Sequence, residues 1–119
     1  MGFKLPKTAL LRKPAQYNVV YRQGKRFRGT HFSLIFIEND HGFNRLGISV
    51  HGVKKAVLRN RMKRVIREFF RVNRDFLSPS KDIVFAVRKE CIFKNPHEVF
   101  TAVTNAVNAS SLSDNRRRS

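Results

Sequence analysis

Acidic residues are scarce in this sequence. The 119 residues include 8 Asp and Glu against 25 Lys and Arg, which gives a formal net charge of +17 and a pI near 11.5. A protein nuclease needs carboxylates to hold a divalent metal or to act as an acid and base pair. The only tight acidic cluster, Glu38 and Asp40 with His41, lies in a predicted turn, where such residues serve the backbone. The composition argues against an intrinsic nuclease and favours a protein that binds a phosphate polymer.

Cysteines and long apolar runs are also missing. The single cysteine, Cys91, excludes an internal disulfide and is typical of a reducing compartment. The longest apolar run, residues 32–37, is far shorter than a membrane span or a secretion signal, so we expect a cytoplasmic protein. Glycine-rich phosphate loops and zinc-ligand spacings do not occur either, and we expect the protein itself to bind no metal or other cofactor.

The length and pattern predict one small α+β domain. Residues 1–12 are basic and aperiodic and residues 109–119 are polar and basic, so we expect tails there and a single RNA-binding domain over residues 13–108. Pro14 and Gly24 are typical of the start and end of a helix. We expect strands over residues 29–37 and 45–51 and a short edge strand over residues 25–28. The turn residues 39–42 suggest that the two longer strands form an antiparallel pair.

The second half of the chain predicts two helices around a buried strand. Residues 82–87 form an apolar run without alternation, which suits a central strand covered on both faces. A helix start is predicted at Asn95, Pro96 and Glu98. The predicted order is therefore helix, three strands, helix, strand, helix, an α-β sandwich.

A strongly basic helix is predicted between these strands. Residues 54–74 contain nine Lys or Arg and one Glu. Helical spacing gathers an apolar stripe, which we expect to be buried: Leu58, Met62, Val65, Phe69 and Val72. The opposite side carries a row of like charges at intervals of four residues, which repel one another unless an anionic partner is bound. A solvated charged face or a membrane-surface helix is the alternative, but the other predicted elements are available to cover the stripe.

Residues 46–71 resemble the signature of the bacterial ribonuclease P protein component. The matching motif is Ala56-Val57, Arg59-Asn60-Arg61, Lys63-Arg64, Ile66-Arg67-Glu68 and Phe70-Arg71. The predicted element order also fits that family over residues 9 to 110. The family usually has a Ser-Lys-Lys stretch before the helix, whereas the approach in this chain, residues 51–55, is one residue shorter.

The resemblance implies a fold and a function. The fold is the ribosomal protein S5 domain 2-like sandwich with a left-handed β-α-β crossover, although about 98% of such units are right-handed. The implied function is that of the RNA-binding protein subunit of an endoribonuclease that removes the 5′ leader from precursor tRNA. The catalyst is the RNA subunit, so the chain alone is expected to be non-catalytic. Magnesium is expected for the RNA-catalysed reaction, and the implied partners are the catalytic RNA and precursor tRNA, with no membrane or protein partner.

The resemblance also assigns two sets of site residues. The basic helix and its approach would bind the RNA subunit through Lys54, Lys55, Arg59, Asn60, Arg61, Lys63, Arg64, Arg67 and Arg71. The single-stranded leader would lie between the first helix and the sheet, on Tyr17, Tyr21, Phe32, Arg88 and Lys89.

Several alternatives stay open at this point. Tyr17 and Tyr21, one helical turn apart, can stack on bases or pack in the core. Arg88 and Lys89 can bind phosphates or end a solvated strand, and Asn60 can bond RNA or tie the helix to a strand. A small ribosomal or general RNA-coating protein is the competing function, and the Arg-Asn-Arg helix argues against it.

Overall fold

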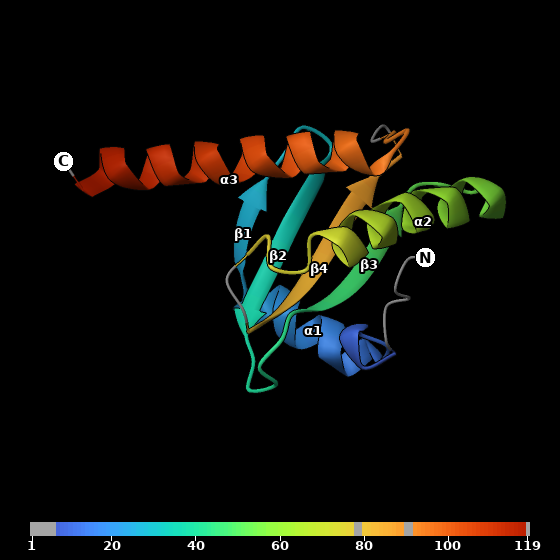
Figure 1. Ribbon diagram of the computed structural model, residues 1–119, viewed down its shortest axis with the longest axis horizontal. Helices are drawn as coiled ribbons and strands as arrows, with labels where there is room; N and C mark the ends of the chain where they lie inside the picture. Colours follow the sequence, from blue (N-terminus) through green and yellow to red (C-terminus); the bar gives the residue numbers. More distant parts are fainter. Residues whose placement is uncertain (1–6, 78–79, 90–91, 119) are drawn as a thin grey trace.

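The computed structural model describes residues 7–77, 80–89 and 92–118, so Cys91 lies outside the described residues. The elements follow the predicted order. They are η1 (Lys7–Ala9), α1 (Pro14–Gln23), β1 (Lys25–Arg28), β2 (Phe32–Glu38), β3 (Arg45–His51), α2 (Ala56–Val72), β4 (Lys81–Arg88) and α3 (Pro96–Arg118) (Figure 1).

The strands form a mixed sheet in the order β1-β2-β4-β3. β4 pairs in parallel with β3 and antiparallel with β2, and β1 pairs antiparallel with β2. The predicted pairing of β2 with β3 is therefore wrong, because β4 lies between them. Their turn has the expected chemistry, since the Asn39 side-chain oxygen accepts a hydrogen bond from the His41 N–H and Gly42 has φ +82°. A local turn signal does not reveal a later strand that is buried on both faces and takes the central place.

The β3-α2-β4 crossover is left-handed. With β3 and β4 pointing upward and α2 in front of the sheet, β4 lies to the left of β3 (Figure 1). This arrangement opposes the usual handedness of parallel β-α-β units. The expectation drawn from the family resemblance is confirmed.

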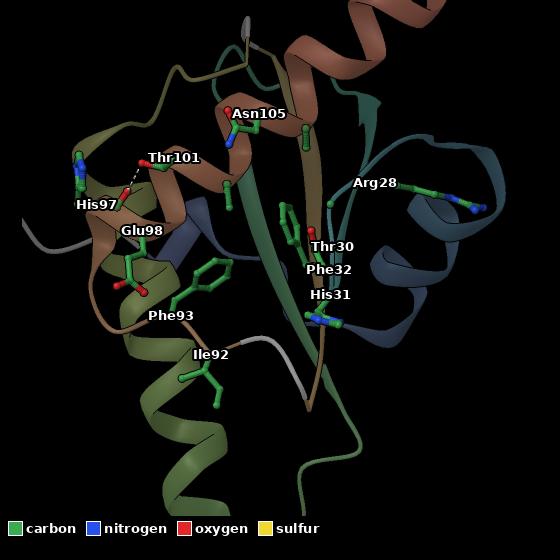
Figure 2. Close-up of a pocket in the computed structure, with 13 residues that line it drawn as sticks. Arg28, Thr30, His31, Phe32, Ile92, Phe93, His97, Glu98, Thr101 and Asn105 are labelled. Atoms are coloured by element: carbon green, nitrogen blue, oxygen red, sulfur yellow. Dashed lines mark hydrogen bonds between the residues drawn. The ribbon is translucent and has the colours of Figure 1, made fainter.

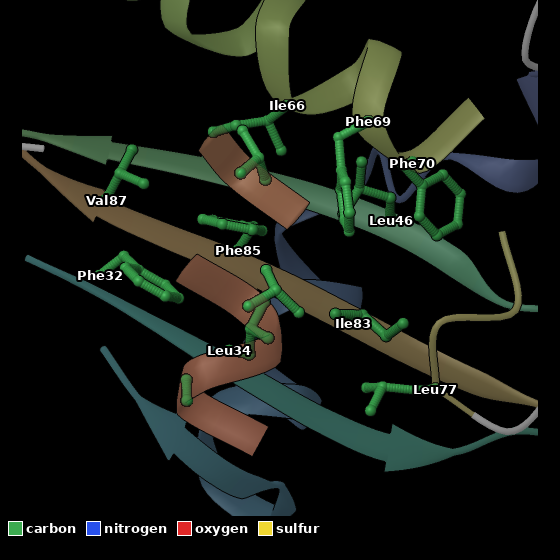
Figure 3. Packing of buried hydrophobic residues seen from close by; sticks show 13 residues of the cluster. Phe32, Leu34, Leu46, Ile66, Phe69, Phe70, Leu77, Ile83, Phe85 and Val87 are labelled. Carbon is green, nitrogen blue, oxygen red and sulfur yellow. The ribbon is translucent and has the colours of Figure 1, made fainter. Parts of the chain in front are cut away.

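Helices cover the two faces of the sheet unequally. The larger apolar cluster joins α2 and α3 to one face, where Leu34, Ile83 and Phe85 are fully buried (Figure 3). The smaller cluster joins α1 to the other face through Val20, Ile35 and Val84. Neighbouring β4 residues point to opposite faces, so both clusters meet at this strand.

The buried side of α2 is turned relative to the predicted stripe. Phe69 is buried as expected, but Ile66 and Phe70 are also fully buried, whereas Leu58 and Val72 are 47% and 64% exposed. Leu58 lies near the end of α2 that extends beyond the sheet (Figure 1). No strand covers that end, so helical periodicity alone overestimated the burial there.

Regular backbone structure occurs within both segments that the sequence predicts to be tails. Ala9 and Leu11 are buried, and the Leu11 N–H donates to the Leu46 carbonyl at 2.8 Å, so these residues pack on the domain within the segment assigned to a tail. At the other end α3 continues to Arg118, through residues that were also assigned to a tail. Polar composition alone did not indicate this helical backbone.

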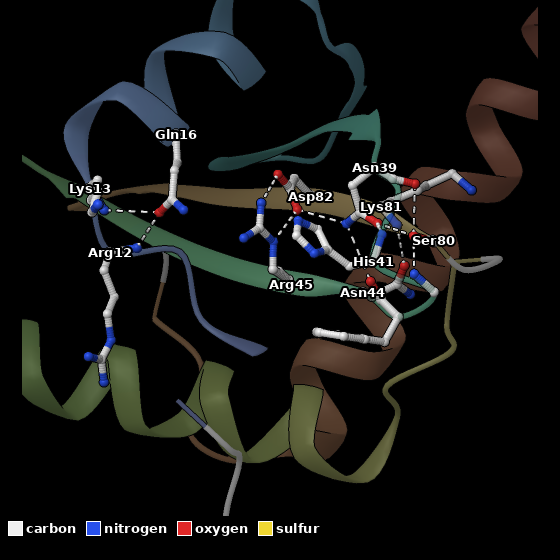
Figure 4. A network of polar contacts seen from close by, with 12 residues as sticks. Arg12, Lys13, Gln16, Asn39, His41, Asn44, Arg45, Ser80, Lys81 and Asp82 are labelled. Carbon is white, nitrogen blue, oxygen red and sulfur yellow. Dashed lines mark hydrogen bonds and ion pairs between the residues drawn. The ribbon is translucent and has the colours of Figure 1, made fainter. Parts of the chain in front are cut away.

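A buried polar network fixes the start of β4 (Figure 4). Asp82 accepts hydrogen bonds from Arg45 Nε at 2.7 Å and Nη2 at 2.6 Å and from Asn39 Nδ2 at 2.8 Å. Asn44 is 1% exposed and donates through Nδ2 to the carbonyls of Arg74 and Leu77, both at 2.8 Å. Its Oδ1 accepts the Lys81 N–H at 2.9 Å. Asn44 thus ties the end of the α2 connection to the first residue of β4.

Replacing Asn44 with alanine should lower the free energy of unfolding by about 2 to 4 kcal/mol. The substitution leaves two carbonyls and one N–H near a buried position without their partner, and each such loss costs about 1 to 3 kcal/mol less any relief by water. Asn105→Ala, at an exposed position of α3, is the matched control. Urea unfolding measures both variants, and equal midpoints would contradict the structural role of Asn44.

Candidate RNA-binding surfaces

The outer side of α2 presents a cationic face to solvent. Its residues are exposed, apart from Lys63, which is half-buried: Asn60, Arg61, Lys63, Arg64 and Arg67. Burial of Ile66, Phe69 and Phe70 fixes the rotation of the helix and turns Asn60, Arg64 and Arg67 away from the core. Within the described residues no hydrogen bond ties Asn60 to a strand, so its amide is available to RNA.

Two of the predicted RNA-contacting arginines have partners within the protein. Arg59 donates through Nη1 to the Val53 carbonyl at 3.0 Å and to the Lys54 carbonyl at 2.8 Å. Arg71 forms an ion pair with Glu68, and the hydrogen bond from its guanidinium lowers the pKa of the Glu68 carboxyl. Arg59 therefore holds the approach to α2 in place, while Glu68 partly offsets the charge of Arg71.

Tyr17 and Tyr21 lie together on α1, where they pack against the smaller apolar cluster. Tyr17 is half-buried, burial raises its pKa, and its hydroxyl donates to the Leu11 carbonyl at 3.4 Å. Its ring lies over Gly47, where an added Cβ would be 2.7 Å from the nearest ring carbon. The buried Tyr21 hydroxyl has no hydrogen-bonding partner among the described residues. Both rings are therefore core contacts on one side, and neither is fully enclosed.

α1 covers only part of its face of the sheet. A helix is about 10 Å wide, whereas a strand as long as β4 extends about 26 Å. Alternation places polar side chains on the remainder of this face, namely Ser33, Ser49, His51 and Arg88. A strip of polar sheet surface thus lies beside the two tyrosines.

Tyr17 is also close to the basic helix. A hollow of about 250 Å³ between α1, β3 and α2 is lined by Tyr17, Lys63, Arg67 and Arg12, among others. Two residues that the sequence assigned to the RNA subunit therefore share a hollow with one assigned to the leader. Arg12 was missed because it lies in the segment assigned to a tail.

Arg88 and Lys89 are not brought together. Arg88 lines a hollow of about 160 Å³ with Ser33, Arg26 and Arg28. Lys89 instead lines a groove with Lys54 and Lys55, beside the start of α2. Arg88 is the last residue of β4 and Lys89 is the first residue after it, and their side chains lie on two different surfaces. Arg26 and Arg28 were missed, although their alternation in a predicted edge strand was a usable signal.

Phe32 does not lie with the tyrosines. It is 6% exposed on the face of the sheet that carries α2 and α3, and its ring stacks on Phe85 with centroids 5.2 Å apart. Figure 2 shows Phe93 beside it, with the centroids of the Phe32 and Phe93 rings 5.9 Å apart. The prediction that Phe32 holds the leader beside Tyr17 and Tyr21 is corrected by this position, because the sheet separates them.

The described part of the chain has neither a metal-ligand cluster nor a membrane-spanning helix. Among the described residues, no group of three His, Cys, Asp or Glu side chains is placed to hold a metal ion. None of the helices in that part of the chain is long and apolar enough to cross a bilayer.

Comparison with known proteins gives one consistent result. Residues 5–110 match the Ribonuclease P family model. The ribonuclease P protein component of Desulfotalea psychrophila is 48% identical over 102 residues, which cover 85% of each chain. The structure of the Staphylococcus aureus RNase P protein has a TM-score of 0.74 and 27% identity, covering 87% of this chain and 96% of that one. The Thermotoga maritima RNase P protein has a TM-score of 0.68 and 30% identity, covering 80% and 91%.

The family match spans residues 5–110, which contain the Arg-Asn-Arg helix, all four strands of the sheet and the first part of α3. The two solved structures align with 80% or more of this chain at 27% and 30% identity. This chain belongs to the family of bacterial ribonuclease P protein components.

Proposed function

We propose that this subunit of ribonuclease P binds two RNA molecules on two surfaces and leaves the chemistry to the RNA subunit. The observation that carries the proposal is the separation of its cations. One group lies on the outer side of α2, and another, formed by Arg26, Arg28 and Arg88, lines a hollow on the α1 side of the sheet. A general coating protein has no need of two differently built surfaces, whereas a subunit that joins a ribozyme to its substrate does.

The outer face of α2 is the proposed contact with the catalytic RNA. Arg61, Arg64 and Arg67 are exposed on a rigid helix, which suits guanidinium recognition of phosphates. Lys54 and Lys55 extend this surface beyond the helix start. Arg59 supports it indirectly by holding the carbonyls of the approach.

The α1 side of the sheet is the proposed site of the 5′ leader of precursor tRNA. Tyr17 and Tyr21 offer ring surface for unpaired bases, and Arg88 with Arg26 and Arg28 offers donors for phosphates. Such contacts tolerate any sequence, as a subunit acting on many tRNA precursors requires. Lys63 and Arg67 connect the two surfaces through the hollow beside Tyr17.

The proposal also covers the role of magnesium and the place in the cell where the protein acts. Magnesium is assigned to the RNA-catalysed step and to RNA folding, with the protein supplying fixed positive charge instead of metal ligands. The proposed place of action is the cytoplasm, where precursor tRNA is made in bacteria.

Replacing Arg64 and Arg67 with glutamine should weaken binding to the catalytic RNA and reduce its salt dependence. Each lost phosphate contact should flatten the slope of log affinity against log salt concentration by about 0.7 to 0.9. Arg22→Gln with Lys25→Gln removes the same charge from exposed positions outside both surfaces and should leave the slope near that of the parent. Filter binding across a salt series measures this slope for each variant. Equal slopes for the two double variants would show that the outer face of α2 is only a solvated surface.

Replacing Tyr17 and Tyr21 with leucine should weaken the assembled enzyme's binding of precursor tRNA by about 1 to 3 kcal/mol per stacked base, without changing its affinity for mature tRNA. Leucine retains apolar packing and removes the aromatic face. The matched control, Tyr17→Phe with Tyr21→Phe, keeps both rings, and at Tyr21 it removes a hydroxyl that has no partner among the described residues.

Dissociation constants for precursor and mature tRNA, with thermal unfolding of each variant, complete this experiment. If the leucine variant is folded and loses affinity equally for both tRNAs, the rings are core residues and the leader lies elsewhere.

A further inference from the structure

A groove beside the start of α2 combines an apolar floor with a cationic rim. It has a volume of about 610 Å³, within the range of about 300 to 1,000 Å³ that is usual for ligand sites. The floor consists of Val53, Leu58, Met62, Ile92 and Phe93, and the rim carries Lys54, Lys55, Arg61, Lys89 and Lys94. No carboxylate is among the described residues that line it.

The floor is exposed to an unusual degree for a small protein. Leu58 is 47% and Ile92 is 74% exposed, although they come from different elements and lie in one groove. Exposed apolar side chains that gather within a polar rim are a feature of interaction sites. Five cations around them also repel one another in the free protein. An occupant should therefore supply an apolar surface and negative charge together.

One wall of the groove is held in place before anything binds. Arg59 fixes one wall through its hydrogen bonds to the carbonyls of Val53 and Lys54. α2 begins at this wall with no side-chain cap and no acidic residue in its first turn, so its first N–H groups are available to an anion. A preformed site loses less entropy on binding than one that has to be assembled.

We infer that this groove holds one unpaired nucleotide of the catalytic RNA, with its base on Leu58, Ile92 and Phe93 and its phosphates on the surrounding lysines. This inference rests on the proposed function. Lys54, Lys55 and Arg61 continue the cationic face of α2, so RNA bound there also reaches the groove. An unpaired nucleotide presents an apolar base and negative phosphates within a few ångströms, whereas paired RNA hides its bases. Lys89 thereby belongs to the ribozyme-binding surface instead of the leader site.

The first test changes the floor without changing charge. Leu58→Gln with Ile92→Gln is compared with Val57→Gln, which lies on the same helix at a 78% exposed position outside the groove. The floor variant should bind the catalytic RNA about tenfold more weakly, with the salt slope of the parent, because no cation has been lost. The control should bind as the parent does. Unchanged affinity of the floor variant, or the same loss in the control, would overturn the inference.

The second test identifies the occupant. The full-length protein carrying Leu58→p-benzoylphenylalanine is assembled with the catalytic RNA and irradiated. Cross-links should converge on one unpaired nucleotide. Removing the base of that nucleotide should weaken RNA binding by the parent protein about tenfold. It should not further weaken RNA binding by the floor variant, which already lacks the apolar contact. Three outcomes would each overturn the inference. The cross-links could spread over paired helices, they could form only to an acidic protein added from lysate, or the abasic RNA could bind as tightly as the intact RNA.

A parallel arm separates this inference from the proposed function. If Arg64→Gln with Arg67→Gln weakens RNA binding while the floor variant does not, only the nucleotide site is rejected. If neither variant weakens RNA binding, the proposed RNA-binding function of α2 is rejected as well.

Discussion

The structure depends on the burial of the apolar side chains of β4 on both faces of the sheet. Ile83, Val84, Phe85 and Val87 have no exposed surface, so both faces of the sheet must be covered around this strand. α2 and α3 cover one face, and the shorter α1 covers only part of the other. The central strand therefore determines where the protein is closed and where sheet surface remains beside Tyr17 and Tyr21. It also requires a crossover from β3, and that crossover is the basic helix itself.

The second constraint is charge of one sign. A net charge of +17 on a domain of this size repels itself, and the structure relieves little of this repulsion internally, since Arg45 with Asp82 and Arg71 with Glu68 are the ion pairs found in the described part of the chain. RNA offsets the rest. The core fixes the directions of the cations proposed to face the ribozyme and of those proposed to face the substrate, because α2 is held by Ile66, Phe69 and Phe70 and the sheet by both apolar clusters. A Lys or Arg side chain can contact any phosphate, so the choice of RNA depends on where the helices and strands position these side chains.

Much of this was predictable from the sequence, and the failures have local physical causes. The element order, the central strand and the basic helix follow from periodicity and motif. The pairing of β2 with β4 could not be predicted in this way, because a turn signal describes only neighbouring residues and β4 comes from a distant part of the chain. Phe32 and Tyr17 are both aromatic, but only the sheet geometry shows that they lie on opposite faces. Arg88 and Lys89 are adjacent in sequence and divide between two surfaces, and the role of Arg59 depends on carbonyls whose positions no motif encodes. Residue types were easier to predict than the directions in which they point.

This protein is proposed to supply binding surfaces to a catalyst made of RNA. The most direct measurement is reconstitution at low magnesium, with leader removal from precursor tRNA followed for the RNA alone, the protein alone and the two together. The account predicts slow cleavage by the RNA, none by the protein, and strong stimulation when they are combined, because fixed cations replace part of the magnesium that folds the RNA and holds the substrate. Cleavage by the RNA-free protein, or no stimulation by a folded protein that binds the RNA, would contradict it.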